Sequence, residues 1–236
     1  MSNESFSFKQ FTIRQSRCAM KVSTDGVLLG AWAPIEKSTS ILDIGTGTGL
    51  LALMAAQRNP SALITAIEID SDAAAQAREN ADASPWGERI TILSADVREF
   101  SSQSPFDAII CNPPYFTRSL RNPDEARATA RHDDTLSLEE LTTLAPSLLA
   151  DGGSVSIVLP IERRADIIPL MTMRGLFLLQ QTTVLPTQEK SPTRILMTFR
   201  KGLTAHPRSD KLCIALSPGV YTEEYRALTK DFYLYF

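Results

Sequence analysis

The chain has 236 residues, 43% of them hydrophobic and 22% charged, which is typical of a folded globular protein and excludes intrinsic disorder. Its formal net charge of −3 argues against a protein that binds nucleic acid over its whole surface. The longest apolar run, residues 50–56, is far shorter than the roughly 20 residues of a membrane span. No secretion signal is visible and three scattered cysteines form neither a disulfide framework nor a zinc site, so we expect a cytoplasmic protein without membrane or metal partners.

Apolar, β-branched runs alternate along the chain with segments of helical pattern. Such alternation is typical of a parallel sheet covered by helices on both faces, so we expect an α/β fold. No linker divides the chain, and we expect a single domain over residues 1–236, with an N-terminal extension at 1–35 and a core at 36–236. The expected strands are 41–45, 63–69, 90–93, 107–111 and 154–159, then a returning pair at 177–185 and 194–199, and the expected helices are 49–57, 73–81 and 138–149.

A glycine-rich turn closes the first strand of the core and opens its first helix. It reads Asp43-Ile-Gly45-Thr-Gly47-Thr-Gly49. Glycine permits a sharp turn and lets a ligand approach the backbone closely. Leu50 stands where a dinucleotide-binding motif would have its last glycine, which disfavours NAD. A plain connection between strand and helix is the simpler alternative for this turn taken alone.

Two acidic residues follow the next two strands: Glu68 ends strand 63–69, and Asp96 comes directly after strand 90–93. Taken alone, each could be a helix cap or a solvated charge, but their order at successive strand ends favours a ligand site. Together with the glycine turn they resemble the class I S-adenosylmethionine-dependent methyltransferases. The resemblance implies a Rossmann-like fold with a mostly parallel seven-stranded sheet, an antiparallel edge strand and helices on both faces. It also implies S-adenosylmethionine as cofactor, packed against the turn of Gly45, Gly47 and Gly49 and held at its amino acid end by Asp43, at the ribose by Glu68 and near the adenine amine by Asp96.

The tetrapeptide Asn112-Pro113-Pro114-Tyr115 directly follows strand 107–111. Proline fixes φ and donates no hydrogen bond, so the tetrapeptide forms a stiff loop that presents acceptors. The Asn112 side-chain oxygen and the Pro113 backbone oxygen can accept the two hydrogens of an exocyclic amine, and Tyr115 can stack on a planar substrate. The tetrapeptide resembles the signature of amino-methyltransferases, which act on adenine N6, guanine N2 or glutamine. That resemblance makes all four residues catalytic candidates and places Asn112 beside the cofactor as well.

Further stretches outside these motifs resemble one family more closely. They are Phe8-Lys-Gln-Phe11, residues 17–33, Ser84-Pro-Trp-Gly-Glu-Arg-Ile90 and residues 221–234, and they are similar to the bacterial tRNA1(Val) adenine-N6 methyltransferases. This resemblance implies methyl transfer to the N6 amine of adenosine 37 in the anticodon loop of a tRNA. It also places Lys21, Thr24 and Asp25 where the family's N-terminal segment folds over the cofactor. A plain turn is the alternative for Asp25.

Charge is unevenly distributed along the chain. Residues 62–112 carry nine acids against three arginines, whereas residues 1–22 sum to +3 and residues 186–211 to +4. Such asymmetry is an interaction signal, although exposed loops often carry lysine and arginine without a partner. Acids balance the arginines that follow the tetrapeptide, so a solvated loop is an equal alternative there. The candidate RNA contacts are Lys9, Arg14, Arg17, Arg118, Arg121, Lys190 and Arg194.

Three rival functions remain. A glutamine methyltransferase of a release factor usually carries a separate helical N-terminal domain, for which about 35 residues are too few. A catalytically silent RNA-binding protein of the same fold would not need the acidic positions and the tetrapeptide to be intact. A DNA adenine methyltransferase would need a target-recognition domain that this length does not provide. We therefore expect an enzyme whose partner is tRNA, and its oligomeric state stays open.

Overall fold

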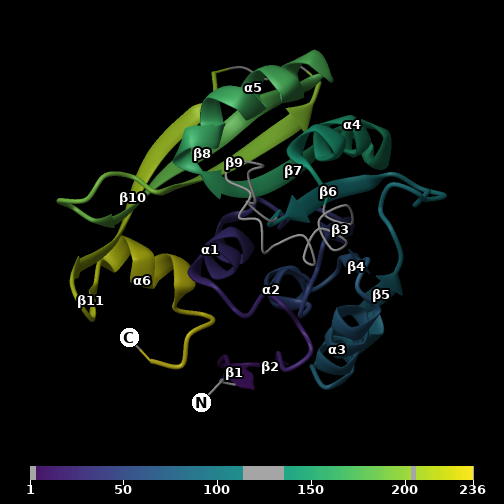
Figure 1. Ribbon diagram of the computed structural model, residues 1–236, viewed down its shortest axis with the longest axis horizontal. Helices are drawn as coiled ribbons and strands as arrows, with labels where there is room; N and C mark the ends of the chain where they lie inside the picture. Colours follow the sequence, from purple (N-terminus) through teal and green to yellow (C-terminus); the bar gives the residue numbers. More distant parts are fainter. Residues whose placement is uncertain (1–3, 114–135, 203–205, 236) are drawn as a thin grey trace, which may run out of the picture.

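The computed structural model describes residues 4–113, 136–202 and 206–235. Its centre is a nine-stranded sheet with the order β11-β10-β8-β9-β7-β6-β3-β4-β5 (Figure 1). Most neighbouring strands are parallel, which confirms the expected α/β class. The strands are β3 (Ser40–Ile44), β4 (Leu63–Glu68), β5 (Ile90–Ser94), β6 (Phe106–Cys111), β7 (Leu149–Pro160), β8 (Leu176–Thr187), β9 (Arg194–Lys201), β10 (Arg208–Ser217) and β11 (Val220–Tyr221).

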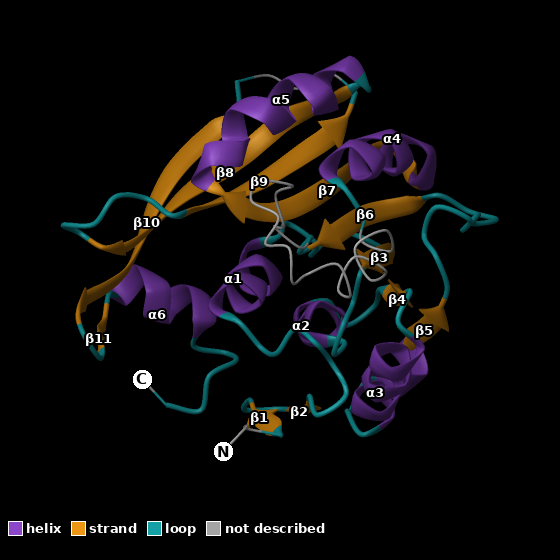
Figure 2. Ribbon diagram, in the orientation of Figure 1, coloured by secondary structure: helices purple, strands orange, loops and turns teal. Residues whose placement is uncertain are grey.

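Helices cover both faces of this sheet (Figure 2). Because successive side chains of a strand point to opposite faces, Ile41 belongs to the core on one face and Leu42 to the core on the other. The first core packs against α1, α2, α3 and α6, and the second against α4 and α5. The helices are α1 (Thr24–Trp32), α2 (Leu50–Arg58), α3 (Ser71–Asp82), α4 (Leu138–Leu148), α5 (Arg164–Met173) and α6 (Glu223–Thr229). Among the described residues, no helix has both the length and the apolar character needed to cross a membrane.

The antiparallel strand β11 at the edge of the sheet confirms the expected edge strand, whereas the number of strands among the described residues and a second antiparallel strand differ from the expectation. Nine strands replace seven, and the long antiparallel strand β9 lies inside the sheet, between β7 and β8. Residues 195–199 of β9 are all buried, as suits a strand covered on both faces. Beyond β8, the parallel strand β10 and the short antiparallel strand β11 extend the edge. The first four residues of β10 are exposed and include Arg208 and Asp210, so the apolar alternation that predicts a strand is missing.

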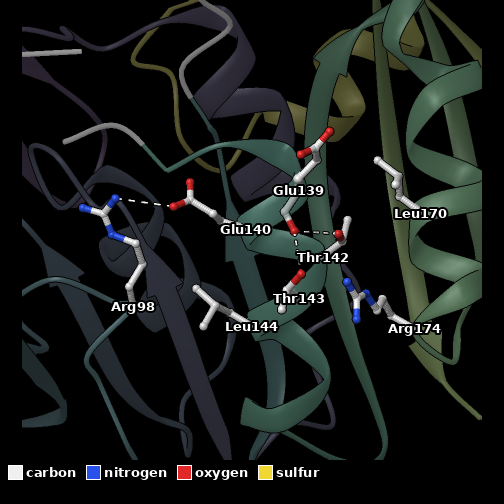
Figure 3. A pocket seen from close by; sticks show the side chains of 8 residues that line it. All are labelled: Arg98, Glu139, Glu140, Thr142, Thr143, Leu144, Leu170 and Arg174. Carbon is white, nitrogen blue, oxygen red and sulfur yellow. Dashed lines mark hydrogen bonds and ion pairs between the residues drawn. The ribbon is translucent and has the colours of Figure 1, made fainter. Parts of the chain in front are cut away.

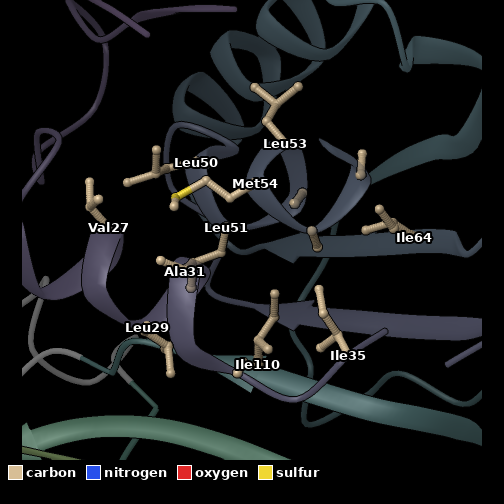
Figure 4. Close-up of a cluster of buried hydrophobic side chains, with 14 of the residues drawn as sticks. Val27, Leu29, Ala31, Ile35, Leu50, Leu51, Leu53, Met54, Ile64 and Ile110 are labelled. Atoms are coloured by element: carbon tan, nitrogen blue, oxygen red, sulfur yellow. The ribbon is translucent and has the colours of Figure 1, made fainter. Parts of the chain in front are cut away.

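Helix α1 lies within the N-terminal extension and packs deeply against α2. Its residues 26–31 are all buried, and Figure 4 shows Val27 beside Leu50 and Ala31 beside Leu51 where the two helices meet. Gly30 allows this close approach, because a Cβ there would stand 2.5 Å from the Met54 sulfur. Helix α1 of the N-terminal extension and helix α2 of the core are thereby joined through one apolar interface.

The hairpin of β1 (Ser5–Ser7) and β2 (Thr12–Arg14) packs against the C-terminal segment, and Figure 1 shows both at the same side of the molecule. Phe8 stacks on Phe11 at 4.7 Å between ring centroids and on Tyr233 at 6.0 Å. Trp86 meets Phe11 edge-on at 5.9 Å. Three of the stretches that carry the family resemblance therefore form one aromatic cluster, although they lie far apart in sequence.

Candidate functional site

The glycine turn lies at the carboxyl edge of the sheet, where β3, β4, β5 and β6 end. Gly45 and Gly47 have φ values of +68° and +55°, a region that other residues rarely adopt. The Gly45 amide donates to the Ile67 carbonyl at 2.9 Å, and the Gly47 amide donates to Glu68 Oε2 at 2.8 Å. A Cβ on either glycine would meet no described atom within 4 Å, so the space above both is open. The turn thus presents bare backbone to that space.

Gly49 has a different part in the same turn. It ends the turn with a φ of +83° at the N-cap of α2, and a Cβ there would contact Ala77 of α3 at 3.4 Å. Its lack of a side chain therefore serves helix packing, whereas Gly45 and Gly47 face open space.

Asp43 lies beneath the turn and is fully buried. Its Oδ2 accepts hydrogen bonds from Thr46 Oγ1 at 2.5 Å and from the Ala52 amide at 3.1 Å. Its Oδ1 has no hydrogen-bond partner among the described residues. Burial raises the pKa of this carboxyl to about 7, against the lowering effect of the two hydrogen bonds. In this structure Asp43 fastens the turn to the start of α2.

Glu68 ends β4 and is half-buried beside the turn. Its Oε2 holds the Gly47 amide, and its Oε1 accepts a hydrogen bond from the Asp70 amide at 3.1 Å. The end of β4 and the glycine turn are thereby held in register. The sequence places Glu68 at this edge, and the structure adds its direct bond to the turn.

Asp96 follows β5 and is held by Arg98, a residue that the sequence analysis missed. Arg98 Nε lies 2.9 Å and 2.8 Å from the two carboxylate oxygens, and the Arg98 amide donates to Oδ1 at 2.9 Å. The guanidinium lowers the pKa of Asp96, so its carboxylate stays ionised. Arg98 also reaches Glu140 at 3.4 Å, at the start of α4. An arginine two residues after an acid carries no pattern that would have singled it out.

Beside this pair a hollow of about 430 Å³ lies between α4 and α5 (Figure 3). No predicted site residue is among its lining residues, which are Arg98, Glu139, Glu140, Thr142, Thr143, Leu144, Leu170 and Arg174. The hollow therefore lies beside Arg98, the partner of Asp96, and none of its lining residues belongs to the glycine turn.

Asn112 follows β6, which pairs with β3 so that Cys111 stands opposite Ile44, next to Gly45. Asn112 is half-buried and Pro113 is buried. The Asn112 Nδ2 lies 3.8 Å from the sulfur of Met20, so the segment before α1 reaches this position. Pro114, Tyr115, Arg118 and Arg121 lie outside the described residues.

The other N-terminal candidates gather at the same edge. Thr24 and Asp25 form the first turn of α1, whose N-cap is Ser23, and Lys21 is exposed just before it. Asp25 Oδ2 accepts a hydrogen bond from Arg194 Nε at 2.7 Å. A candidate cofactor residue and a candidate RNA residue are therefore paired with each other.

The remaining candidate RNA contacts are spread over a wider area. Lys9 Nζ donates to the Lys230 carbonyl at 2.6 Å, and Arg17 forms an ion pair with Glu79 of α3. Arg14 is exposed at the end of β2, and Lys190 is exposed in the turn between β8 and β9. Of these, Lys190 lies at the carboxyl edge, because β8 ends and β9 begins there.

The residues present fit S-adenosylmethionine. Open space lies above Gly45 and Gly47, and the partly exposed carboxylates of Glu68 and Asp96 stand at the ends of neighbouring strands β4 and β5. Carboxylates accept hydrogen bonds from hydroxyl and amine groups, as the ribose and adenine of that cofactor require. Among the described residues, no three His, Cys, Asp or Glu side chains cluster as metal ligands.

Comparison with known proteins gives the class of this arrangement. Residues 26–173 match the family model for the methyltransferase small domain. The fold matches a predicted O-methyltransferase from Agrobacterium tumefaciens with a TM-score of 0.70 at 22% identity, covering 90% of this chain and 98% of that one. It also matches a 16S rRNA N2 G1207 methyltransferase from T. thermophilus with a TM-score of 0.57 at 20% identity, covering 84% and 49%. Fold and site together define a class I methyltransferase, which uses S-adenosylmethionine as methyl donor.

Two curated relatives define the family more closely. Both are named tRNA1(Val) (adenine(37)-N6)-methyltransferase. The relative from Phocaeicola vulgatus is 48% identical over 99% of both chains, and that from Pseudoalteromonas translucida is 47% identical over 97% of this chain and 98% of its own. The chain belongs to the tRNA1(Val) (adenine(37)-N6)-methyltransferase family, which confirms the resemblance found in the sequence.

Proposed function

We propose that this chain transfers the methyl group of S-adenosylmethionine to the N6 amine of adenosine 37 in tRNA1(Val). The observation that carries the proposal is the position of Asn112 and Pro113 at the end of β6, next to the open glycine turn on β3. This juxtaposition brings amine acceptors and a cofactor site to one edge. The reaction belongs in the cytoplasm, where tRNA is modified.

The proposed chemistry depends on hydrogen-bond acceptors. The Asn112 side-chain oxygen and the Pro113 carbonyl oxygen hold the two hydrogens of the amine, which turns its lone pair out of the ring conjugation. When bound, S-adenosylmethionine supplies an electrophilic methyl group on a sulfonium. Asn112 and Pro113 thus orient the nitrogen towards that methyl, and positioning supplies much of the rate. A strong base is not required, because the nitrogen becomes cationic as it gains the methyl group and then readily gives its proton to water.

The first experiment tests both substrate and catalytic residue. Purified chain, labelled S-adenosylmethionine and an unmodified tRNA1(Val) transcript should give one methyl group per tRNA, located at adenosine 37 by nucleoside mass spectrometry. A transcript with guanosine at position 37 is the matched control and should remain unlabelled. Asn112→Ala should lower transfer at least a hundredfold while calorimetry still detects cofactor binding, because Asn112 is expected to act mainly on the amine.

Two outcomes would contradict the proposal. Label in the guanosine-37 transcript would show another target, and unchanged transfer by Asn112→Ala would remove the proposed acceptor. The rival glutamine methylation is tested in the same assay with a release factor in place of tRNA. A silent RNA-binding protein would bind tRNA but transfer no label.

A further inference from the structure

An ion pair joins two distant segments at the carboxyl edge. Arg194 Nε lies 2.7 Å from Asp25 Oδ2, and 169 residues separate the two in sequence. The pair is partly sheltered, because the Asp25 side chain is 19% exposed and that of Arg194 33%. It links the first turn of α1 to the first residue of β9.

Helix α1 is held in place without this pair. Val27, Leu28 and Leu29 are fully buried in the core, and at the other end Trp32 Nε1 donates to Thr182 Oγ1 at 2.9 Å. A partly exposed ion pair adds little to the stability of such an interface. The pair therefore restrains only the first turn of α1, and its loss should leave the fold intact.

The start of α1 lies against Asn112. Met20 contacts Asn112 Nδ2 through its sulfur at 3.8 Å, and a Cβ on Gly26 would stand 3.9 Å from the same nitrogen. Asp25 lies between these two contacts in sequence. A displacement of the first turn of α1 would thus be transmitted directly to the Asn112 amide.

We propose that Asp25 and Arg194 are positioning residues that clamp residues 20–26 against Asn112 and so fix the amine acceptor. The proposal rests on the proposed function, since it assigns to Asn112 the task of holding the amine. It also gives both residues a common task, in place of direct cofactor contact for Asp25 and direct RNA contact for Arg194.

The test uses Asp25→Asn, Arg194→Gln, Arg194→Lys and the charge swap that combines Asp25→Arg with Arg194→Asp. We expect each of the first two to lower kcat about tenfold or more, because small misplacements of reacting groups are costly. The KM for tRNA and the Kd for cofactor should stay within about twofold of the original values. Arg194→Lys and the charge swap should recover most of kcat. Amide hydrogen exchange of residues 18–26 should speed up in Asp25→Asn and Arg194→Gln and slow again in the swap.

Arg208→Gln is the matched control. Arg208 Nε lies 2.8 Å from Asp210 Oδ2 on β10, in a similar ion pair far from Asn112, so its loss should change neither kcat nor exchange at 18–26. The clamp is refuted if Asp25→Asn changes neither kcat nor exchange at 18–26. It is also refuted if Arg194→Gln raises the KM for tRNA and the charge swap does not restore kcat. A weaker cofactor Kd in Asp25→Asn as the only change would refute it as well. Hydrogen exchange needs no substrate, so it tests the clamp even if the tRNA assay refutes the proposed function.

Discussion

The buried carboxyl of Asp43 makes the stability of this protein depend on pH. Its pKa is raised to about 7 in the folded chain and is about 4 in an unfolded one. Between those values the folded state binds more protons than the unfolded state, so this residue lowers the free energy of unfolding as pH rises through the window. Above about pH 7 its effect is constant.

Asp43→Asn should remove this dependence. The free energy of unfolding of the variant, relative to the original chain, should improve by up to about 4 kcal/mol between pH 4 and pH 7, because asparagine carries no charge to bury. An asparagine oxygen can still accept the bonds from Thr46 and Ala52. Urea denaturation at several pH values measures the free energy of unfolding of both proteins. If the two plots of this free energy against pH were parallel, the raised pKa of Asp43 would be contradicted.

Individual partners of the acidic residues were not predictable from sequence. Parallel strands bring their carboxyl ends to one edge, so Glu68 and Asp96 could be placed there from strand order alone. The ion pair of Arg98 with Asp96 depends on the direction of the two side chains, which the sequence does not specify. The ion pair of Arg194 with Asp25 joins residues that are 169 positions apart, and residue spacing gives no signal for such a contact.

Helices α1 and α2 meet at a contact that admits no additional atom. A Cβ on Gly30 would stand 2.5 Å from the Met54 sulfur and 3.1 Å from its Cβ. Gly30→Ala should therefore lower the free energy of unfolding by about 1–3 kcal/mol, although alanine favours a helix. Combined with Met54→Ala, it should cost much less than the sum of the two single changes, because the cavity receives the new methyl. Urea denaturation of the four proteins measures this coupling, and strict additivity would argue against the contact.

The helices and strands whose apolar residues recur with a clear helical or strand period were predicted from the sequence, whereas those without such a period were missed. The strands β3 to β9 and the helices α2, α3 and α4 all lie within a few residues of their expected positions, apart from the longer β7. Helix α1 was missed because its apolar residues surround it on all sides, so that no amphipathic stripe marks it. Strand β10 was missed because its exposed start is charged.

The described residues of the basic segment 186–211 are divided between the two opposite edges at which the strands of the sheet begin and end. Since β9 runs antiparallel to its neighbours, Lys190 and Arg194 lie at the carboxyl edge, while Lys201 and Arg208 lie at the other. Lys201 also binds the carbonyl oxygens of Pro146 and Leu149 at 3.0 Å and 2.9 Å, where it caps the end of α4. Only part of the segment can therefore approach a tRNA bound at Asn112.

This division predicts different effects of two exposed cations. Lys190→Ala should weaken tRNA binding and reduce the slope of log K against log salt by about 1, because one phosphate contact is lost. Arg208→Ala should leave the affinity and the slope unchanged. Titrations of tRNA at several salt concentrations measure the affinity and the slope for each variant. Equal effects of Lys190→Ala and Arg208→Ala would contradict binding of the tRNA at the carboxyl edge of the sheet.

The contact between the two terminal segments has a consequence for biosynthesis. The Lys9 amide bonds to the Phe232 carbonyl at 2.8 Å, across almost the full length of the chain. At about 5–20 residues per second, a ribosome needs roughly ten seconds or more to travel from one to the other. Until then Phe8 lacks the aromatic ring of Tyr233 that stacks on it. Packing of the N-terminal hairpin is therefore complete only after Tyr233 has been made, and a nascent chain released before Tyr233 would leave Phe8 without this cover against proteases.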